Sequence, residues 1–375
     1  MSGSRQLVAV NFRDPAHPEA GGAELHLEHI LLEAVRRGFR VTWLACGFPG
    51  AAREAEHRGM RVLRRGAFWN FNAVVPGVLR GELARPLPDL VIEDVNKVPC
   101  FTPWHTRAPV GVIVPHLFGS TAFREATLPV ALYVLALEGL IPRAYARAPF
   151  LAISESTRDD LMARGIAPER IRVVHCGLDH ALYRRDPAVP KAARPTILFV
   201  GRVRRYKGLG WVVRALPRVL RQVPDARLQV LGDGPYLAEL KLETARRGLA
   251  HGVEFPGFRP AADKVRAMQE AWVLVQPSPK EGWGLTVVEA GGCGTAVIAA
   301  DSPGLRDSVR AGETGLLVRY QDEEALAAAL IRVLRDQPLR ERLAAAGVAW
   351  AARFQWPECA RQSLDALLDG AGVPR

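Results

Sequence analysis

The sequence contains two runs in which short apolar segments alternate with longer, helix-compatible ones, and this alternation constrains the fold more than any other feature. Each apolar segment has the length of a buried strand, and strands that alternate with helices are typical of parallel sheets. The expected strands lie at 7–11, 41–45, 90–92, 110–114, 150–154 and 171–174 in the first run, and at 196–200, 228–231, 253–258 and 271–276 in the second. The sequence therefore predicts an α/β fold with two parallel sheets.

A proline-rich stretch separates the two runs. Residues 184–195, RRDPAVPKAARP, contain three prolines and no helical or strand periodicity, as expected of a linker. A chain of 375 residues also exceeds the size at which a single core usually keeps growing. We predict a first domain at 1–183, a linker at 184–195 and a second domain at 196–353, followed by an amphipathic helix at 355–370.

Composition and cysteine spacing are those of an ordinary globular protein. The chain is 49% hydrophobic and 24% charged, and it contains no run of about eighteen apolar residues that would span a membrane. The first expected strand begins too early to leave room for a signal peptide, so we expect a cytoplasmic protein. The five cysteines are widely spaced without a CxxC pair, which indicates neither disulfides nor a zinc site.

The net charge of +11 is concentrated in the second half of the chain. Residues 1–182 contain 21 Lys and Arg against 18 Asp and Glu, whereas the remainder contains 29 against 21. Within the second half, residues 184–227 contain twelve basic side chains and two acidic ones. This excess favours a phosphate-bearing ligand. We expect no nucleic acid, because no aromatic stacking motif or DNA-reading helix accompanies the charge.

Two stretches of the first half are candidates for contact with a membrane surface. Residues 53–65 contain five arginines, which form either a solvated face or a contact with an anionic membrane or a phosphorylated acceptor. Residues 128–141 are strongly apolar but include Glu138 and Gly139, so we expect a buried or interfacial helix rather than a membrane span.

Two candidate site segments of the first half follow expected strands. Gly21 and Gly22 lie between the first strand and a helix, where they allow a ligand to approach the backbone closely. The pattern is not GxGxxG, so it does not indicate a dinucleotide site. His116 follows the strand at 110–114 and is expected at the same edge of the sheet, because ligands bind at the carboxyl ends of parallel strands. His175 and Cys176 are adjacent on a strand and point to opposite faces, which argues against a nucleophile and base pair.

The second half supplies basic and backbone groups at three strand ends. Arg202 and Lys207 lie in a glycine-bounded loop after the strand at 196–200, where both can grip a diphosphate. Gly257 and Phe258 end the strand at 253–258, where main-chain groups can contact a base.

The stretch 277–294, PSPKEGWGLTVVEAGGCG, joins a strand to a helix and contains two carboxylates with seven residues between them, Glu281 and Glu289. Gly282 and Gly284 leave the backbone bare. Free amides and the helix dipole favour an anion at a helix start. The amides expected there belong to Trp283, Gly284, Leu285 and Thr286. A sugar, a diphosphate and a ribose in a row fit this arrangement.

Taken together, GGAE, His116, GRVRRYKG, LGDGP, VEFPGF and EGWGLTVVE resemble glycosyltransferase family 4, whose members are retaining enzymes with the GT-B fold. The resemblance covers nearly the whole chain in the expected order. It implies two Rossmann-like domains with parallel sheets facing across a cleft, with the C-terminal helix at 355–370 packing back on the first domain. The first domain would bind the acceptor and the second the donor.

The resemblance also implies roles for the candidate residues. Arg202 and Lys207 would hold the donor diphosphate and stabilise the charge of the leaving group. Glu289 would bind the ribose hydroxyls, and Glu281 would lie beside the donor sugar. Gly21 and Gly22 would approach the phosphates, His116 would orient the reacting sugar, and Gly257 and Phe258 would contact the base. The backbone from Gly282 to Thr286 would contact sugar and phosphate.

By the same resemblance, the co-substrate is a nucleotide sugar, with UDP favoured and GDP-mannose next, and the acceptor is a saccharide, a lipid-linked molecule or a small molecule. No DxD triplet occurs, so neither a metal nor another cofactor is expected. Cys176 stands where the family usually has Asn. The alternatives are a GT-B epimerase, which would need no acceptor, and a non-catalytic nucleotide-sugar-binding subunit. A phosphorylase would need a lysine for pyridoxal phosphate and a longer chain, and neither is found in this sequence.

Overall fold

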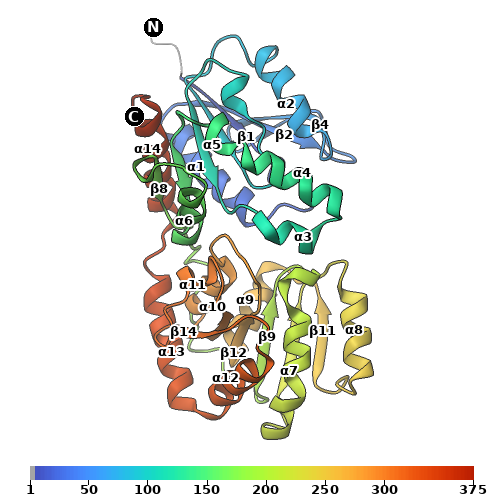
Figure 1. The fold of residues 1–375 in the computed structure, drawn as a ribbon. Helices are drawn as coiled ribbons and strands as arrows, with labels where there is room; N and C mark the ends of the chain where they lie inside the picture. Colours follow the sequence, from blue (N-terminus) through green and yellow to red (C-terminus); the bar gives the residue numbers. More distant parts are fainter. Residues whose placement is uncertain (1–4) are drawn as a thin grey trace. The chain divides into compact units, whose positions relative to one another are not determined.

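The computed structural model describes residues 5–375, apart from the side chains of residues 124 and 125. The chain divides into two compact units (Figure 1). Unit 1 comprises Met1–Gly177 and Trp356–Arg375, and unit 2 comprises Leu178–Gln355. Each unit has its own sheet with helices packed on it, as the two runs of the sequence predict.

Unit 1 contains an eight-stranded sheet in the order β3-β4-β2-β1-β5-β6-β7-β8. All neighbouring strands are parallel except β3 and β4, which are antiparallel. Its central strands are apolar on both faces, as expected of a parallel sheet covered on both sides. The strands are β1 (Gln6–Val10), β2 (Arg40–Gly47), β3 (Glu54–His57), β4 (Met60–Ala67), β5 (Leu90–Asp94), β6 (Val110–Val114), β7 (Phe150–Ala152) and β8 (Ile171–Val173).

Helices connect the parallel strands of unit 1. Ser154 caps α6 by accepting a hydrogen bond from the Thr157 amide, a common way to satisfy a free amide at a helix start. The helices are α1 (Gly22–Arg36), α2 (Phe71–Arg80), α3 (Ala122–Glu125), α4 (Leu128–Gly139), α5 (Ile141–Ala144), α6 (Glu155–Ala163) and α14 (Trp356–Ala371). No described helix is long and apolar enough to cross a membrane.

The arginine-rich stretch at 53–65 is a β-hairpin, β3–β4, which the sequence analysis did not predict. Its turn residues Arg58 and Gly59 have φ of 49° and 82°, the backbone that a two-residue hairpin turn requires. Arg61 and Arg65 both pair with Glu54 and Glu82. Arg64 is buried against Asp14 and Arg58 pairs with Glu28. Most of the charge in this stretch is therefore neutralised within unit 1.

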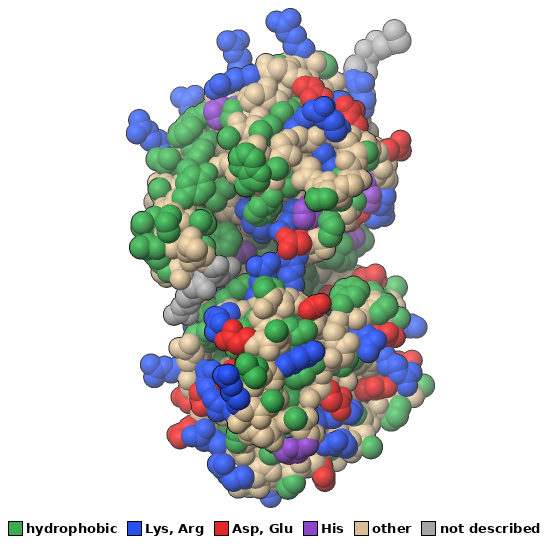
Figure 2. All heavy atoms as spheres, turned by 90° about the vertical axis from the view of Figure 1, so that its right-hand side faces the viewer, with side chains coloured by type: hydrophobic (Ala, Val, Ile, Leu, Met, Phe, Trp, Pro, Cys, Tyr) green, Lys and Arg blue, Asp and Glu red, His purple; other side chains and the backbone are tan. Residues whose placement is uncertain are grey.

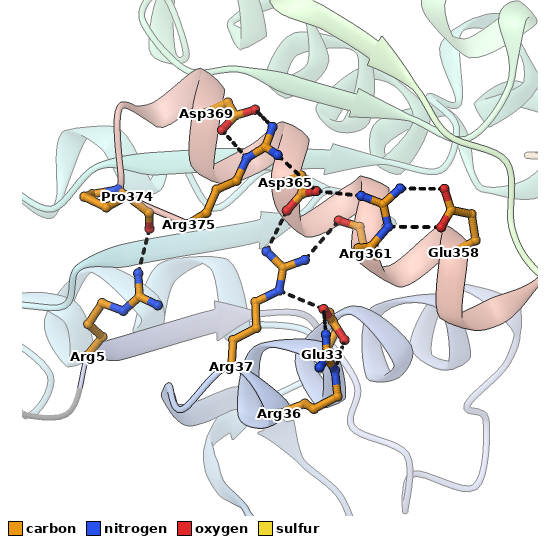
Figure 3. Close-up of polar contacts among 10 residues, drawn as sticks. All are labelled: Arg5, Glu33, Arg36, Arg37, Glu358, Arg361, Asp365, Asp369, Pro374 and Arg375. Atoms are coloured by element: carbon orange, nitrogen blue, oxygen red, sulfur yellow. Dashed lines mark hydrogen bonds and ion pairs between the residues drawn. The ribbon is translucent and has the colours of Figure 1, made fainter.

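The C-terminal helix α14 belongs to unit 1, where it packs on α1 and against β6. Leu367 lies over Gly111 of β6, whose lack of a side chain makes room for it. Arg37 at the end of α1 donates to Asp365 of α14 at 2.6 Å (Figure 3). Arg361 and Arg375 also pair with Asp365, so charged groups surround the apolar contact between the two helices.

Unit 2 contains a six-stranded parallel sheet in the order β11-β10-β9-β12-β13-β14. Its strands are β9 (Thr196–Val200), β10 (Arg227–Leu231), β11 (Val253–Gly257), β12 (Val273–Gln276), β13 (Ala296–Ala300) and β14 (Gly315–Val318). Its helices are α7 (Leu209–Gln222), α8 (Leu237–Arg246), α9 (Ala261–Glu270), α10 (Leu285–Gly292), α11 (Leu305–Ser308), α12 (Glu323–Arg335) and α13 (Gln337–Ala351). The order reverses direction at β9, so β9 and β12 flank a topological switch point.

The structure divides the chain a few residues away from the predicted boundaries. Residues 178–183, predicted in the first domain, lie in unit 2, where the Leu178 amide donates to Phe354 O at 3.0 Å. The predicted linker at 184–195 also lies in unit 2. Its Lys191 donates to Ala271 O at 2.8 Å and Gly294 O at 3.0 Å. The proline-rich composition of residues 184–195 predicted a linker, but it could not predict these contacts with unit 2.

Candidate active site

The donor-side residues predicted from the sequence gather at one edge of the unit 2 sheet. The carboxyl ends of β11, β10, β9 and β12 lie next to one another in that order. The Gly201 amide, after β9, donates to Leu231 O at 3.0 Å, and the Gly232 amide, after β10, donates to Gly257 O at 2.9 Å. The loops after these strands therefore meet at the edge where ligands bind parallel sheets.

Glycine is required where the basic loop meets the end of β12. Gly208 follows the single-turn helix Arg205–Lys207 and has a φ of 78°. A Cβ at Gly208 would lie 2.2 Å from Pro277 O, inside van der Waals contact. The absence of a side chain thus lets the loop with Arg202 and Lys207 approach the loop with Glu281.

Lys207 and Glu281 form an ion pair at this edge, with Nζ and Oε1 2.5 Å apart. Their side chains are only 15% and 16% exposed. Gln276 Nε2 also donates to Glu281 Oε1 at 2.9 Å. Burial acts to raise the pKa of Glu281, but the charge and hydrogen bond of Lys207, with hydrogen bonds from Ser278 and Gln276, hold it below its usual value. The carboxylate of Glu281 is therefore charged at neutral pH.

The loop after β12 leads into the first turn of α10. Gly284 precedes the helix with a φ of 84°, and the amides of Leu285 and Thr286 lie in the first turn, where helical amides have no partner within the helix. The Trp283 side chain is buried against Phe354, with ring centroids 5.2 Å apart. Trp283 thus anchors the loop, and the amides of Leu285 and Thr286 lie at a helix start, a position that favours an anion.

Glu289 lies on α10 beside two residues that the sequence analysis did not identify. Lys264 of α9 donates from Nζ to Glu289 Oε2 at 3.0 Å. Tyr183 hydrogen-bonds the same carboxylate; burial and then the charge of Glu289 raise the pKa of the Tyr183 phenol. The Lys264 ammonium also lies 4.7 Å from the centre of the Tyr183 ring. Glu289 is thus held by one cation and one hydroxyl.

The basic residues of 184–227 are not one continuous patch. Arg205, Arg214, Arg218 and Arg227 pair with acidic residues from other segments of unit 2. Arg202 lies two residues after β9, at the edge that also holds Lys207. At the end of β11, Gly257 has a φ of 77°, and the Phe258 side chain is 79% exposed. An exposed aromatic ring at this edge is available to a planar base.

In unit 1, the glycine pair begins α1. Gly22 is the first residue of the helix, and the Gly21 amide donates to Glu24 Oε2 at 2.7 Å. Both glycines are exposed. His116 lies two residues after β6, with its ring centroid 5.3 Å from that of Phe118. Since β1 and β6 both neighbour β5, the two segments lie at the same edge of the unit 1 sheet.

A buried polar cluster that the sequence analysis did not identify lies beneath the glycine pair. Asn11 Nδ2 donates to Asp94 Oδ2 at 3.0 Å, and Asn96 Nδ2 donates to Asn11 Oδ1 at 2.9 Å. Burial and then the charge of Glu24 raise the pKa of Asp94 well above its usual range. The sequence did indicate this cluster, because Asn11 directly follows β1 and Asp94 ends β5, and the carboxyl ends of parallel strands lie at one edge of the sheet. No comparable pattern in the sequence indicated Lys264 or Tyr183.

Cys176 is buried in unit 1, and burial raises the pKa of its thiol well above the usual range. His175 Nδ1 lies 3.1 Å from Ile153 O and its Nε2 lies 3.4 Å from Glu155. A neutral, enclosed thiol is a poor nucleophile. Both observations agree with the expectation that Cys176 and His175 do not act as a nucleophile and its base.

Comparison with known proteins identifies both halves of the chain. The model of the family described as Glycosyltransferase Family 4 matches residues 20–182, and that described as Glycosyl transferases group 1 matches residues 184–350. The D-inositol 3-phosphate glycosyltransferase of Corynebacterium diphtheriae is 33% identical over 56% of this chain and 52% of its own length. The phosphatidyl-myo-inositol mannosyltransferase of Mycobacterium leprae is 38% identical over 44% of each chain. These alignments span about half the length of the curated relatives.

Solved structures share the fold over nearly the whole chain. Sucrose-phosphate synthase from Thermosynechococcus elongatus has a TM-score of 0.81 and 22% identity, covering 96% of this chain and 97% of its own. Anabaena HepE, solved with UDP and glucose, has a TM-score of 0.75 and 20% identity, covering 97% of this chain and 100% of its own. With both halves matched by glycosyltransferase models and each unit built on a parallel sheet, the chain belongs to the enzymes of glycosyltransferase family 4 and has the GT-B fold.

Proposed function

We propose that the protein transfers a sugar from a nucleotide-sugar donor to a hydroxyl acceptor, with retention at the anomeric carbon and without a metal ion. The observation that carries this proposal is the largely enclosed ion pair of Lys207 and Glu281, which lies at the carboxyl edge of the unit 2 sheet beside the first turn of α10. An ammonium, a carboxylate and free amides at one edge suit a donor that joins a diphosphate to a sugar.

In this mechanism the bond between the sugar C1 and the diphosphate oxygen breaks, and both electrons leave with the diphosphate. Lys207, Arg202 and the amides of Leu285 and Thr286 stabilise the charge that develops on the leaving group, which is where electrostatic catalysis is most effective. The acceptor hydroxyl bonds to C1 on the face that the diphosphate leaves, and its proton passes to a phosphate oxygen. Glu281 binds sugar hydroxyls and stabilises positive charge near C1.

The remaining roles follow the family resemblance. Glu289 binds the ribose hydroxyls, and Gly257 and Phe258 contact the base. Gly21, Gly22 and His116 of unit 1 act on the phosphates and the reacting sugar. UDP is our first choice of nucleotide, supported by the UDP and UDP-glucose complexes of HepE, and GDP-mannose is the second. The acceptor is a saccharide, a lipid-linked molecule or a small molecule.

A thermal-shift panel tests the donor assignment. The purified protein is heated with UDP, UDP-glucose, GDP or GDP-mannose, each with and without EDTA, because a ligand that binds only the folded state raises the melting temperature. We expect stabilisation by one nucleotide class, unchanged by EDTA. Stabilisation by none would contradict the site, and stabilisation that EDTA removes and manganese restores would contradict the metal-free mechanism.

An acceptor panel with the stabilising donor separates transfer from epimerisation. A transferase releases nucleoside diphosphate in proportion to the glycosylated acceptor, and the product keeps the anomeric configuration of the donor. An epimerase would convert the donor without any acceptor, and a binding subunit would do neither.

A further inference from the structure

Helix α4 of unit 1 has its apolar side chains on the outside. Of its 12 residues, only Ala131 and Glu138 are buried. Leu128 is 62% exposed, and Leu132 is 53% exposed. A helix that is apolar all round normally lies in a protein core or in a membrane. In α4 the one charged residue faces the protein, and the apolar residues face outward.

The buried carboxylate is what attaches α4 to the rest of unit 1. Glu138 is fully buried and accepts hydrogen bonds from the amides of Phe118 at 2.6 Å and Gly119 at 3.0 Å. Arg164, which directly follows α6, donates to the same carboxylate at 3.1 Å. A buried carboxylate is tolerated only with such partners. The hydrogen bonds and the ion pair of Glu138 hold α4 on unit 1, while most apolar side chains of α4 do not pack against unit 1.

The apolar surface continues onto the segment that begins α2. Asn72 Nδ2 of α2 donates to the Tyr133 hydroxyl of α4 at 2.6 Å, so the two elements lie side by side. Just before α2, Trp69 is 81% exposed. Figure 2 shows hydrophobic side chains gathered over this side of unit 1. We name the surface the apolar face and define it by Phe68, Trp69, Leu128, Val130, Leu132 and Tyr133.

Unit 1 also presents basic side chains around α5, which follows α4 directly. Arg107, Arg143 and Arg147 are exposed, and none forms an ion pair with another described residue. Arg107 and Arg147 line a surface hollow of about 590 Å³ together with Trp104. Residues 98–154 contain four arginines against Glu125 and the buried Glu138. Figure 2 shows Lys and Arg side chains along the margin of the hydrophobic region.

We propose that the apolar face of unit 1 inserts into the surface of an anionic lipid bilayer, with Arg107, Arg143 and Arg147 at the headgroup phosphates. Helix α4 has 12 residues, whereas a helix needs about 20 to span the hydrocarbon, so it lies in the interface. Exposed Trp and Tyr side chains prefer this depth, and basic side chains next to an apolar surface are attracted to anionic lipids.

The charge distribution favours a bilayer over a second copy of the chain. In a symmetric dimer the same patch meets itself, which would bring the arginine margins of the two copies together. Within residues 98–154 no exposed described carboxylate opposes Arg107 and Arg143, whereas Arg147 shares a second hollow with Glu169 and Asp369. A lipid phosphate supplies negative charge to Arg107 and Arg143. The proposal does not depend on the proposed sugar transfer.

Vesicle co-sedimentation tests the apolar contact. The full chain is mixed with vesicles of phosphatidylcholine alone, or of phosphatidylcholine with phosphatidylglycerol, and the bound fraction is measured. We expect binding to the anionic vesicles, and the variant L128Q/L132Q should bind at least tenfold more weakly. Leu242→Gln on α8 of unit 2 is the matched control, because Leu242 is 50% exposed, and it should bind like the wild type.

The charge contact is tested by R143E/R147E and by salt. Reversing two arginines should abolish the preference for phosphatidylglycerol, since each basic residue near an anionic surface is worth roughly a fivefold gain in partition. Raising the salt concentration should weaken binding of the wild type more than that of R143E/R147E. Arg246→Glu, exposed on α8, is the matched control and should leave the preference intact.

Four outcomes would overturn the proposal. The first is a wild type that binds neither vesicle composition, and the second is a L128Q/L132Q variant that binds as well as the wild type. The third is a lowered melting temperature of L128Q/L132Q relative to Leu242→Gln, which would show that the protein itself covers the apolar face. The fourth is a dimer by light scattering that L128Q/L132Q dissociates, without vesicle binding, which would make a second copy of the chain the occupant.

Discussion

Among individual residues, the pair of Lys207 and Glu281 explains how two opposite charges are kept at an almost buried position. Each charge alone would be costly there, and each offsets the desolvation of the other. In the proposed mechanism, Lys207 binds the diphosphate and Glu281 binds sugar hydroxyls. The sequence identified both residues, because each belongs to a loop at a strand end, but it could not show that they touch.

The pair gives unfolding a specific pH dependence. The pKa of Glu281 in the folded protein lies below its ordinary value of 4.5. The stabilisation by the pair is therefore complete above pH 4.5 and is lost as the pH falls through the lowered pKa. Urea unfolding of the wild type and Glu281→Gln should give a difference in unfolding free energy that is constant at neutral pH and shrinks in acid.

Glu324→Gln is the control for this comparison, because Glu324 is 83% exposed and pairs only loosely with Arg218. Its difference from the wild type should stay near zero at every pH. A Glu281→Gln difference that grew in acid would contradict the assigned direction of the pKa shift.

Glu289 and His116 should differ in which kinetic constant they affect. If Glu289 binds the ribose as proposed, replacing it with Gln removes charge-assisted hydrogen bonds, and the Kd for the nucleotide should rise roughly 10- to 100-fold. His116→Ala should leave that Kd nearly unchanged and lower kcat by roughly 100-fold, because the role proposed for His116 is to orient the reacting sugar. Calorimetry with the nucleotide and initial rates with the full substrates measure the two effects. The reverse pattern would exchange the two roles.

Among elements, the glycines that join strands to helices determine how closely the loops of the site approach one another. Gly208→Ala should destabilise the protein by about 2–4 kcal/mol, because it adds both a side chain at positive φ and a clash with the backbone. Gly248→Ala is the matched control, since Gly248 also has a positive φ, 68°, but has no atom within 4 Å of its added Cβ. It should cost only about 1 kcal/mol. Equal losses in urea unfolding would show that the loops do not meet closely.

The sequence predicted some elements to the residue and missed others for physical reasons. The strands at 110–114 and 196–200 match β6 and β9, because apolar runs of strand length bounded by turn residues indicate buried strands. The β3–β4 hairpin was missed because its arginines, which pair with Glu54 and Glu82, suggested a solvated surface. Lys264 was missed because α9 carries no motif, and only tertiary packing brings it to Glu289.

For the whole molecule, the two units differ in whether each is formed by one continuous stretch of the chain. Unit 2 is continuous in sequence, whereas unit 1 needs its last twenty residues, Trp356–Arg375, which come after all of unit 2. Helix α14 covers β6 and α1 with Leu364, Leu367 and Leu368, all nearly fully buried. The sequence indicated this helix by its apolar spacing, and the family resemblance implied its place on the first domain.

A chain that ends at Gln355 should therefore lose unit 1 and keep unit 2. Burying a leucine side chain is worth about 1.5–3 kcal/mol, so uncovering Leu364, Leu367 and Leu368 removes an amount comparable to the whole stability of a typical domain. Calorimetry of the truncated chain should show the transition of unit 1 shifted down by tens of degrees or absent, and that of unit 2 unchanged. The melting temperature of unit 2 should still rise with the nucleotide, because the residues proposed to bind the donor all belong to unit 2, except Gly21, Gly22 and His116. Loss of both transitions would show that the two units unfold as one cooperative body. The variant L364A/L367A/L368A of the full chain is the control, because it removes the same leucine contacts without shortening the chain.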